Sequence, residues 1–291
     1  MKLILSRKGF DSQSGGCPSP IFPNGTLYSL PIPGYHSKIK YRDIRHSGTN
    51  IGKVVKDLTH RRKRKNRTGP KARAHLDPDI NRSAYSPRQK NWRPLFGQSG
   101  AAQGHLRNQR VQVDDLFLFF GLFRKVEKIS GRWRFVKDAP ELHILWGWLQ
   151  IGEIHKVDEL AKDELPWAHY HPHRYPSRRK DSTNTLYIAS KTLNLGDGAI
   201  APGAGCFLKF HERLILTNPD GSGVTDWRLP RGFNPDNGKS PLTYHHNPDR
   251  WKHGEKYTYL QSVGRGQEFV LDLDQYPDVT DWLMESVFTC D

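Results

Sequence analysis

Two long apolar runs constrain the fold of this chain more than any other feature of its sequence. Residues 115–123 (DLFLFFGLF) and 142–154 (LHILWGWLQIGEI) are dominated by aromatic and aliphatic side chains, and each contains glycine. Aromatic and β-branched residues favour strands, whereas glycine weakens a helix. We therefore expect both runs to be strands of a buried sheet or barrel rather than helices.

The remaining segments predict shorter elements around this core. The terminal segment 276–288 places Val279, Trp282, Leu283 and Val287 on one helical face. Residues 15–34 are rich in proline and glycine and predict a shaped loop with a turn at PNGTL. Further strands are expected at 2–6, 132–136, 184–190, 213–217, 257–263 and 267–273. The pattern predicts an α+β fold: one domain over 1–291, built around a twisted, partly barrel-like mixed sheet with long loops and a C-terminal helix.

The chain is strongly basic, with a formal net charge of +15. Residues 61–73 (RRKRKNRTGPKAR) contain eight Lys or Arg and no acid, within a basic loop expected at about 60–74. Such a surplus favours a polyanionic partner, because cations release counterions from phosphates. We expect this loop to contact nucleic acid through Arg61, Arg62, Lys63, Arg64 and Lys65; the alternative is a solvated insert without a specific role.

Hydropathy and cysteine usage indicate the cellular compartment in which the protein is expected. No apolar stretch reaches the ~18 residues that a membrane helix needs, and MKLIL is too short for a signal peptide. Cys17, Cys206 and Cys290 show neither a disulfide framework nor zinc-ligand spacing. We expect a cytoplasmic protein with reduced thiols and no membrane partner.

The end of the first predicted strand, SRKGFDSQSGG, concentrates polar groups. Arg7 offers a planar fork for phosphate and Lys8 a point charge, with Ser6 and Asp11 beside them. The stretch matches neither the Walker phosphate loop nor the G-x-G-x-x-G pattern of dinucleotide sites. It predicts a phosphate site, with an ordinary exposed turn as the alternative.

Two histidine-containing stretches are weaker candidates. In HLDPDI, His75, Asp77 and Asp79 could bind a metal or act as acid and base, but the proline favours a turn in which Asp77 caps and Asp79 faces water. In PWAHYHPHRYP, alternating His169, His171 and His173 could share a strand face. The proline and the absence of nearby Cys or Asp make base stacking by the neighbouring aromatics the stronger interpretation. We expect no metal site.

Two glycine-containing stretches carry amides and charges suited to a base or phosphate. FGQSGAAQGHL contains Gln98, Gln103 and His105, whose polar groups suit a nucleobase edge, unless the stretch is only a link into the core. LQSVGRGQEFV contains Arg265 and Glu268 and could be a simple hairpin. A buried Glu268 would need a partner, and Arg265 is the expected one. The chain lacks the G-x-S-x-G elbow of serine hydrolases and the zinc-deaminase motifs.

Several of these stretches, in order, resemble the nucleotide-modification-associated domain family of the third type, found in bacteria and phages. The resemblance spans about residues 2–285 and is carried by LSRKGFDSQSGGCPSPIFPNGTLYSLPIP, HLDPDI, WRPLFGQSGAAQGHL, HILWGWLQIGEI, GAGCFLKFHERLILT and LQSVGRGQEFVLD. It implies an α+β domain that modifies nucleobases or nucleotides, with no reaction or cofactor attached. A looser likeness, over about 40 residues of the core, is to the small PUA and EVE barrels that recognise modified bases.

Two hypotheses of function follow, with DNA or nucleotides as partners in both. In the first, the protein is a transferase that modifies a nucleotide or a base in nucleic acid. Ser6, Arg7, Lys8, His105 and Arg265 then hold the nucleotide and its phosphate, Gln98 and Gln103 read the base edge, and Asp11, Asp79 or Glu268 serves as acid or base. In the second, Trp146, Trp148 or Tyr187 stacks on a modified base without turnover. A basic scaffold is a third, simpler alternative; the sequence leaves the cofactor and oligomeric state open.

Overall fold

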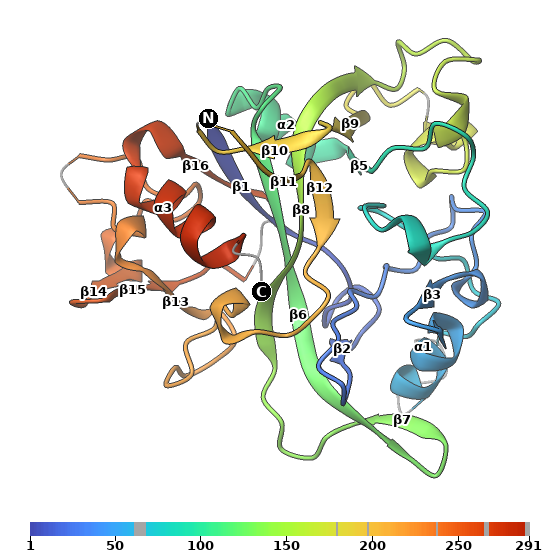
Figure 1. The fold of residues 1–291 in the computed structure, drawn as a ribbon, viewed down its shortest axis with the longest axis horizontal. Helices are drawn as coiled ribbons and strands as arrows, with labels where there is room; N and C mark the ends of the chain where they lie inside the picture. The colour runs from blue at the N-terminus through green and yellow to red at the C-terminus, as the bar shows by residue number, and fades with distance from the viewer. Residues whose placement is uncertain (61–67, 179, 197, 237, 265–267, 289–291) are drawn as a thin grey trace.

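A long antiparallel pair of strands forms the centre of the molecule (Figure 1). The computed structural model describes residues 1–60, 68–178, 180–196, 198–236, 238–264 and 268–288. Strand β6 (Leu116–Ile129) pairs with β8 (Leu142–Lys156), and Leu116 lies opposite Gln150. Their apolar residues are almost all buried. The prediction that both runs form buried strands is confirmed.

Within the described residues, this pair belongs to a nine-stranded mixed sheet. The order along its main path is β16 (Glu268–Asp272), β1 (Lys2–Arg7), β6, β8, β9 (Thr185–Ala189) and β5 (Leu95–Gln98). Strand β1 runs parallel to β6, and the other neighbours on the path are antiparallel. Three strands pair off this path: β2 (Ser19–Ile21) and β7 (Arg132–Phe135) on β6, and β12 (Ala204–Cys206) on β8.

Smaller elements flank the sheet. One three-stranded sheet and two hairpins comprise β13 (Asp226–Pro230), β15 (Tyr257–Gln261) and β14 (Trp251–His253); β10 (Thr192–Asn194) with β11 (Ala199–Pro202); and β3 (Arg45–His46) with β4 (Thr49–Asn50). The α-helices of the described chain are α1 (Ile51–Thr59), α2 (Gly100–Asn108) and α3 (Pro277–Trp282), which continues into a π-helical turn, Leu283–Val287. Figure 1 shows α3 and β13–β15 on one side of the central strands and α1 on the other.

Curvature of the sheet brings its two edges together. Strands β5 and β16 are the ends of the path, yet the Gln98 side chain donates to Glu268, and α2, which follows β5, packs against β16. No strand pairing among the described residues joins β5 to β16, so the sheet is not closed into a barrel. The predicted α+β class with a large mixed sheet and a C-terminal helix is confirmed.

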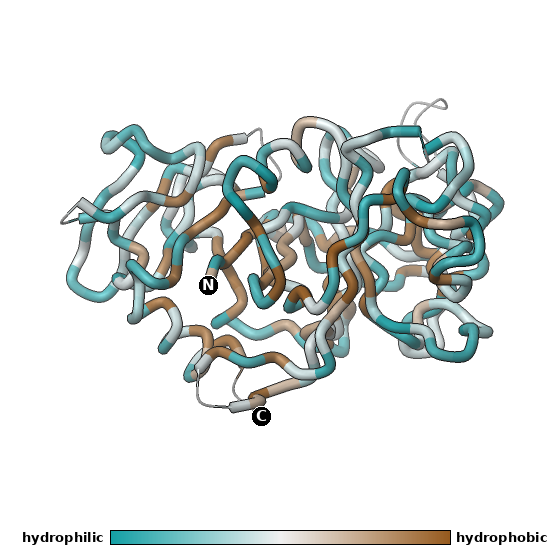
Figure 2. Tube along the Cα trace, turned by 90° about the horizontal axis from the view of Figure 1, so that it is seen from above, coloured by the Kyte–Doolittle hydropathy of each residue, from teal (hydrophilic) through white to brown (hydrophobic). Residues whose placement is uncertain are grey.

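Hydrophobic side chains gather in three clusters. The largest surrounds β1, β6, β8 and β16 and includes Phe117, Trp227 and Phe269. A second lies between α1 and the loops of the first 76 residues, and a third packs Trp92 and Trp167 near β9. Figure 2 shows hydrophobic segments running through the interior and mostly hydrophilic segments at the periphery.

Several local predictions are wrong. Residues 213–217 are not a strand: Glu212–Leu214 is a 3-10 helix, followed by isolated bridges. The sequence pattern missed α1, and the glycine-rich stretch expected to be a loop contains α2. Strands β15 and β16 belong to different sheets, so the stretch between them is not a hairpin. In the described part of the chain, no helix has the length and apolar character needed to cross a bilayer.

Candidate functional site

A cleft of about 720 Å³ opens where β1 and β5 end. Its walls come from the loop after β1, the segment 32–36, the end of β5, and the 3-10 turns near residues 173–178. The charged and polar side chains that line it include Arg7, Lys8, Asp11, His36, His75, Asp77, Gln98, Ser99, Glu141, His143, His173 and Arg178. Segments far apart in the sequence therefore share one concave surface.

One wall of the cleft carries a polar group in which Lys8 and Gln98, both lining the cleft, contact the buried Glu268 behind it. The Lys8 ammonium is 2.8 Å from Glu268 Oε1 and 4.8 Å from the centre of the Phe96 ring. The Gln98 amide also donates to Glu268 Oε1, while Glu268 Oε2 is buried without a hydrogen-bond partner in the described residues. Glu268 is 1% exposed, so this carboxylate depends on Lys8 for its charge balance.

Register explains how this group forms. Antiparallel pairing places Ser6 opposite Glu268 on β16, so their side chains share a face of the sheet. Lys8, two residues further along, points to that same face and reaches Glu268. The expectation that Glu268 needs a partner is confirmed, but its partner among the described residues is Lys8; Arg265 lies outside them.

Arg7 is held by backbone rather than presented freely. Its guanidinium donates to the carbonyl oxygens of Gly264 and Val263, at 3.0 and 3.2 Å. Burial lowers the pKa of Arg7, with the Asp11 carboxylate opposing that shift. Asp11 itself lines the cleft, and its Oδ1 accepts from the backbone amides of Gln13 and Ser14.

A second polar group forms the wall near β5. Asp77 Oδ2 lies 3.5 Å from His75 Nε2 and 3.4 Å from His173 Nε2. Burial would raise the pKa of the Asp77 carboxyl, but polar contacts with His171, His173 and His75 hold it well below its ordinary value. Burial also lowers the pKa of His75. Within the described residues, His75, Asp77 and His173 are a group whose ligand atoms all lie within 4.8 Å of one another, as a metal site requires.

Strand β5 connects the two polar groups. The Gly97 amide donates to Asp77 Oδ1 at 2.8 Å, and the next residue, Gln98, contacts Glu268. A Cβ at Gly97 would stand 2.3 Å from the His173 ring, so only glycine allows this approach. One short strand therefore fixes both groups relative to each other.

A third feature of the cleft is the start of α2. Ser99 is the N-cap residue, and its side chain makes no capping hydrogen bond. The Arg178 guanidinium donates to Ser99 Oγ at 3.2 Å, and both residues line the cleft. Helix starts and guanidinium groups both favour anions, so this corner suits a phosphate or carboxylate.

Comparison with known protein families shows which family this chain belongs to. A family model described as nucleotide modification associated domain 3 matches residues 2–272, nearly the whole chain. The chain belongs to this family. No curated protein and no solved structure matches it in the other two comparisons. The predicted family is confirmed, and the family name indicates involvement in nucleotide modification without naming an activity.

The structure of this nucleotide modification associated domain brings only some of the predicted site residues together. Arg7, Lys8, Asp11 and Gln98 line the cleft, whereas Ser6 and Glu268 lie behind it. Residues Arg61, Arg62, Lys63, Arg64, Lys65 and Arg265 lie outside the described residues.

Two predicted residues on α2 face other partners than the cleft. Gln103 accepts from the Tyr187 hydroxyl at 2.9 Å. His105 is 3.1 Å from Thr243 Oγ1 and packs against the Tyr244 ring. Both contacts tie α2 to the core, which gives these side chains a structural explanation.

The prediction that Asp77 caps a turn and Asp79 faces water is wrong. Asp79 is 1% exposed and forms a two-pronged ion pair with Arg88, whose two terminal nitrogens contact its two oxygens. The Tyr170 hydroxyl donates to the same carboxylate. Asp77, whose side chain is 5% exposed, lies against His75 and His173 at the wall of the cleft. Both acids point inward because partners from distant segments compensate their charge.

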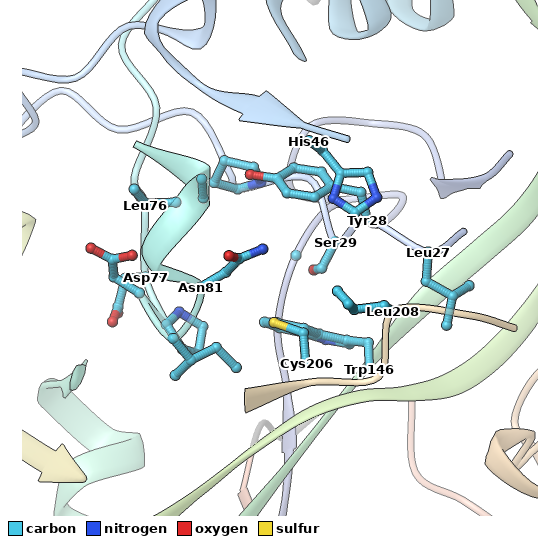
Figure 3. Close-up of a pocket in the computed structure, with 16 residues that line it drawn as sticks. Leu27, Tyr28, Ser29, His46, Leu76, Asp77, Asn81, Trp146, Cys206 and Leu208 are labelled. Carbon is cyan, nitrogen blue, oxygen red and sulfur yellow. The ribbon is translucent and has the colours of Figure 1, made fainter. Parts of the chain in front are cut away.

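Asp79 instead lines a second, smaller pocket, shown in Figure 3. Tyr28 and His46 lie on one side of it and Trp146 and Cys206 on the other, with Asp77 at one end. Burial lowers the pKa of His46 to about 4 and raises that of Cys206 to about 12. Its volume of about 40 Å³ is far below that of the cleft, about 720 Å³.

Sequence reasoning missed the combination of His75, Asp77, His173 and Arg178. His75 and His173 are about 100 residues apart in the chain. Each stretch alone lacks a full set of ligands, and no local pattern shows that the two will meet. The stretch around His171 contains no Cys or Asp of its own, yet Asp77 Oδ1 lies 3.2 Å from His171 Nε2.

Proposed function

We propose that this protein binds a nucleotide, free or within DNA, in the cleft and modifies its base or sugar. The observation that carries the proposal is that one cleft combines an anion-binding corner at Ser99 and Arg178 with the polar groups around Lys8 and Asp77, in a chain of a nucleotide modification family. In the proposal, the phosphate of the ligand binds at Ser99 and Arg178. The reaction at the nucleoside takes place beside the polar groups around Lys8 and Asp77.

The positions of the charged side chains that line the cleft, rather than their net charge, support phosphate binding. The lining carries three cations, Arg7, Lys8 and Arg178, and three carboxylates, those of Asp11, Asp77 and Glu141. The charged groups of Arg7 and Lys8 already contact other protein groups. In the described part of the chain, the Arg178 guanidinium uses one N–H donor, which binds Ser99. Arg178 and Ser99, at the start of α2, are therefore the phosphate site of the proposal; the Gly100 amide already donates to Thr183 Oγ1.

Asp11 is the acid or base of the proposal. Of the three acids predicted for this role, Asp11 lines the cleft, while Glu268 and Asp79 are 1% exposed and compensated by Lys8 and Arg88. Lys8, Gln98 and Glu268 position the wall on which the ligand rests. An enzyme is favoured over a stacking module because Tyr187 is 1% exposed, Trp146 faces the small pocket, and the partly buried Trp148 packs against Phe207 and Phe288.

Nucleotide binding tests the phosphate site. Arg178→Ala should lower the affinity for a nucleoside monophosphate about 10–100-fold in calorimetry and leave the weaker affinity for the nucleoside unchanged, because charge-assisted hydrogen bonds are worth about 1.5–3 kcal/mol. The matched control is Arg132→Ala on the exposed start of β7, which should change neither. Equal losses for nucleoside and nucleotide would contradict a phosphate role.

Product analysis tests modification. Nucleosides from cells with and without the protein are compared by mass spectrometry, and a modified nucleoside should depend on the wild type. Asp11→Asn keeps the acceptor for the Gln13 and Ser14 amides, so it should retain nucleotide binding and lose product. Binding without any product in wild type would instead favour a recognition module.

The basic run has its own test. Deleting residues 61–67 should reduce the salt-dependent binding of long DNA and leave mononucleotide affinity unchanged, since each phosphate contact adds to the salt dependence. If the deletion removed both, charge alone would explain binding and the basic-scaffold alternative would hold.

A further inference from the structure

The wall group near β5 has the composition of a metal site. His75 and Asp77 come from one loop, and His173 comes from the 3-10 turn Pro172–Arg174. All three line the cleft, so an ion among them would be reached by a ligand in that cleft. Imidazole and carboxylate together suit divalent transition metals.

Hydrogen bonds around Asn184 fix the ring of His173. The Asn184 amide nitrogen donates to the carbonyl oxygens of His173 and Arg178, at 2.9 and 3.1 Å. Its Oδ1 is therefore the acceptor that faces His173 Nδ1, and that nitrogen carries the proton. The other ring nitrogen, Nε2, faces Asp77. Such an orienting contact is characteristic of metal-binding histidines.

The two carboxylate oxygens of Asp77 also have different partners. Its Oδ1 accepts from the Gly97 amide at 2.8 Å and lies 3.2 Å from His171 Nε2. Its Oδ2 faces His75 Nε2 and His173 Nε2 at 3.5 and 3.4 Å, distances at the limit of a hydrogen bond. Asp77 Oδ2 therefore lies between two imidazole nitrogens, in a position where one cation could be bound by all three atoms.

The spacing matches a coordination sphere. Ligands bound ~2.1 Å from a tetrahedral ion are about 3.4 Å apart, close to the two Asp77–histidine separations, and all three ligand atoms lie within 4.8 Å of one another. Catalytic metal sites use three protein ligands and leave a further position open, whereas structural sites are closed. Two histidines and one carboxylate are also the ligand set of mononuclear iron(II) sites with open positions.

We propose that His75, Asp77 and His173 bind one divalent transition-metal ion, zinc or iron(II), with its open positions toward the cleft. Asn184 positions His173, and the Gly97 amide positions Asp77. The proposal goes beyond nucleotide binding, because the ion is held by protein side chains alone. Bound there, it would supply a Lewis acid beside the proposed nucleotide site.

Metal affinity is measured on the full-length protein without any nucleotide. Chelator-treated protein is titrated with Zn²⁺ against a chromophoric competitor, and with Fe²⁺ under anaerobic conditions, and metal content is measured by elemental mass spectrometry. We expect one ion per chain and a rise in the unfolding temperature with metal. The preferred ion identifies which of the two metals the site takes.

Variants assign the site. His75→Gln and Asp77→Asn should each lower the affinity at least about 100-fold, and Asn184→Ala about 10–100-fold, as expected for a positioning residue. The matched control is His169→Gln, an exposed histidine of the same segment, which should bind as wild type does. Folding is checked by circular dichroism without metal. His75→Gln is the second route if Asp77→Asn fails to fold, since the His75 side chain is partly exposed.

Two results would overturn the proposal. One is a wild type that binds neither Zn²⁺ nor Fe²⁺ more tightly than His75→Gln does; Asp77 would then serve only as the counter-ion of its histidines. The other is an affinity that His169→Gln lowers as much as His75→Gln. Neither result depends on the nucleotide assays, so the metal proposal and the proposed function can fail separately.

Discussion

Glu268 shows how single residues connect the two edges of the sheet. Its carboxylate is 1% exposed and takes contacts from Lys8, just beyond the end of β1, and from Gln98 on β5. A buried charge is tolerated when its partners are well placed. Removing one partner destabilises the protein by much more than the intact pair stabilises it. These three side chains therefore act as one unit.

A double-mutant cycle tests that unit. Glu268→Gln should lower the free energy of unfolding by about 3–5 kcal/mol, because it leaves the Lys8 ammonium, whose side chain is 11% exposed, without its counter-ion. Lys8→Met combined with Glu268→Gln should cost less than the sum, with a coupling of about 0.5–3 kcal/mol in urea unfolding. Additive effects would show that the pair is not coupled. The exposed pair Lys156–Glu159 is the control and should show no measurable coupling.

At the scale of elements, α2 is the clearest disagreement between sequence and structure. Gly100 and Gly104 fall within a nine-residue helix with one buried residue, Leu106. Glycine opposes a helix, so the local sequence favours a loop. Contacts of Gln103 with Tyr187 and of His105 with Thr243 supply the stabilisation that local propensity lacks. Most helical stability in proteins comes from such tertiary contacts.

Gly104→Ala should therefore stabilise the protein. Apart from its two chain neighbours and the backbone of the helix itself, nothing lies within 4 Å of a Cβ built at Gly104, so alanine adds helix propensity without a clash. The free energy of unfolding should rise by about 0.5–1 kcal/mol. The matched contrast is Gly97→Ala, where the new Cβ would meet the His173 ring and destabilise by about 1–3 kcal/mol. Chemical denaturation of both variants checks the opposite signs, and a loss of stability in Gly104→Ala would contradict this account of α2.

At the scale of the whole molecule, buried neutral histidines link stability to pH. His143 is 4% exposed, and its Nδ1 accepts from the Trp227 indole at 3.0 Å. Burial, with a smaller effect from the Arg7 charge, lowers the pKa of His143 to about 3. The unfolded chain, with a histidine pKa of about 6.5, binds the proton first as pH falls. Stability from this residue is therefore complete above about pH 6.5 and is lost below it.

His143→Gln isolates this contribution. Glutamine can still accept from Trp227 and does not titrate. The difference in unfolding free energy between wild type and variant should shrink by about 1.4 kcal/mol between pH 7.5 and pH 5.5. Urea unfolding at the two pH values measures it. A difference that stays constant with pH would mean that His143 takes up its proton equally in both states.

Local sequence determined the elements whose side chains all face the same environment. The apolar runs of β6 and β8 favour buried strands, because aromatic and β-branched residues favour strands and glycine weakens a helix. The spacing of apolar residues in the segment of α3 and its π-helical turn predicts a helix. The cations at the end of β1 are likewise evident from the sequence. The family assignment also followed from ordered motifs.

Only the tertiary structure decided which polar side chains meet. Curvature of the sheet joins Gln98 to Glu268 across its two edges, and the turn at Pro172–Arg174 carries His173 to Asp77. Both meetings join residues about 100 or more positions apart in the chain, so no local period or spacing encodes them. They depend on how the whole sheet twists and where its long connections return. A buried charge finds its partner through the fold as a whole, which is why Asp79, expected in water, lies against Arg88.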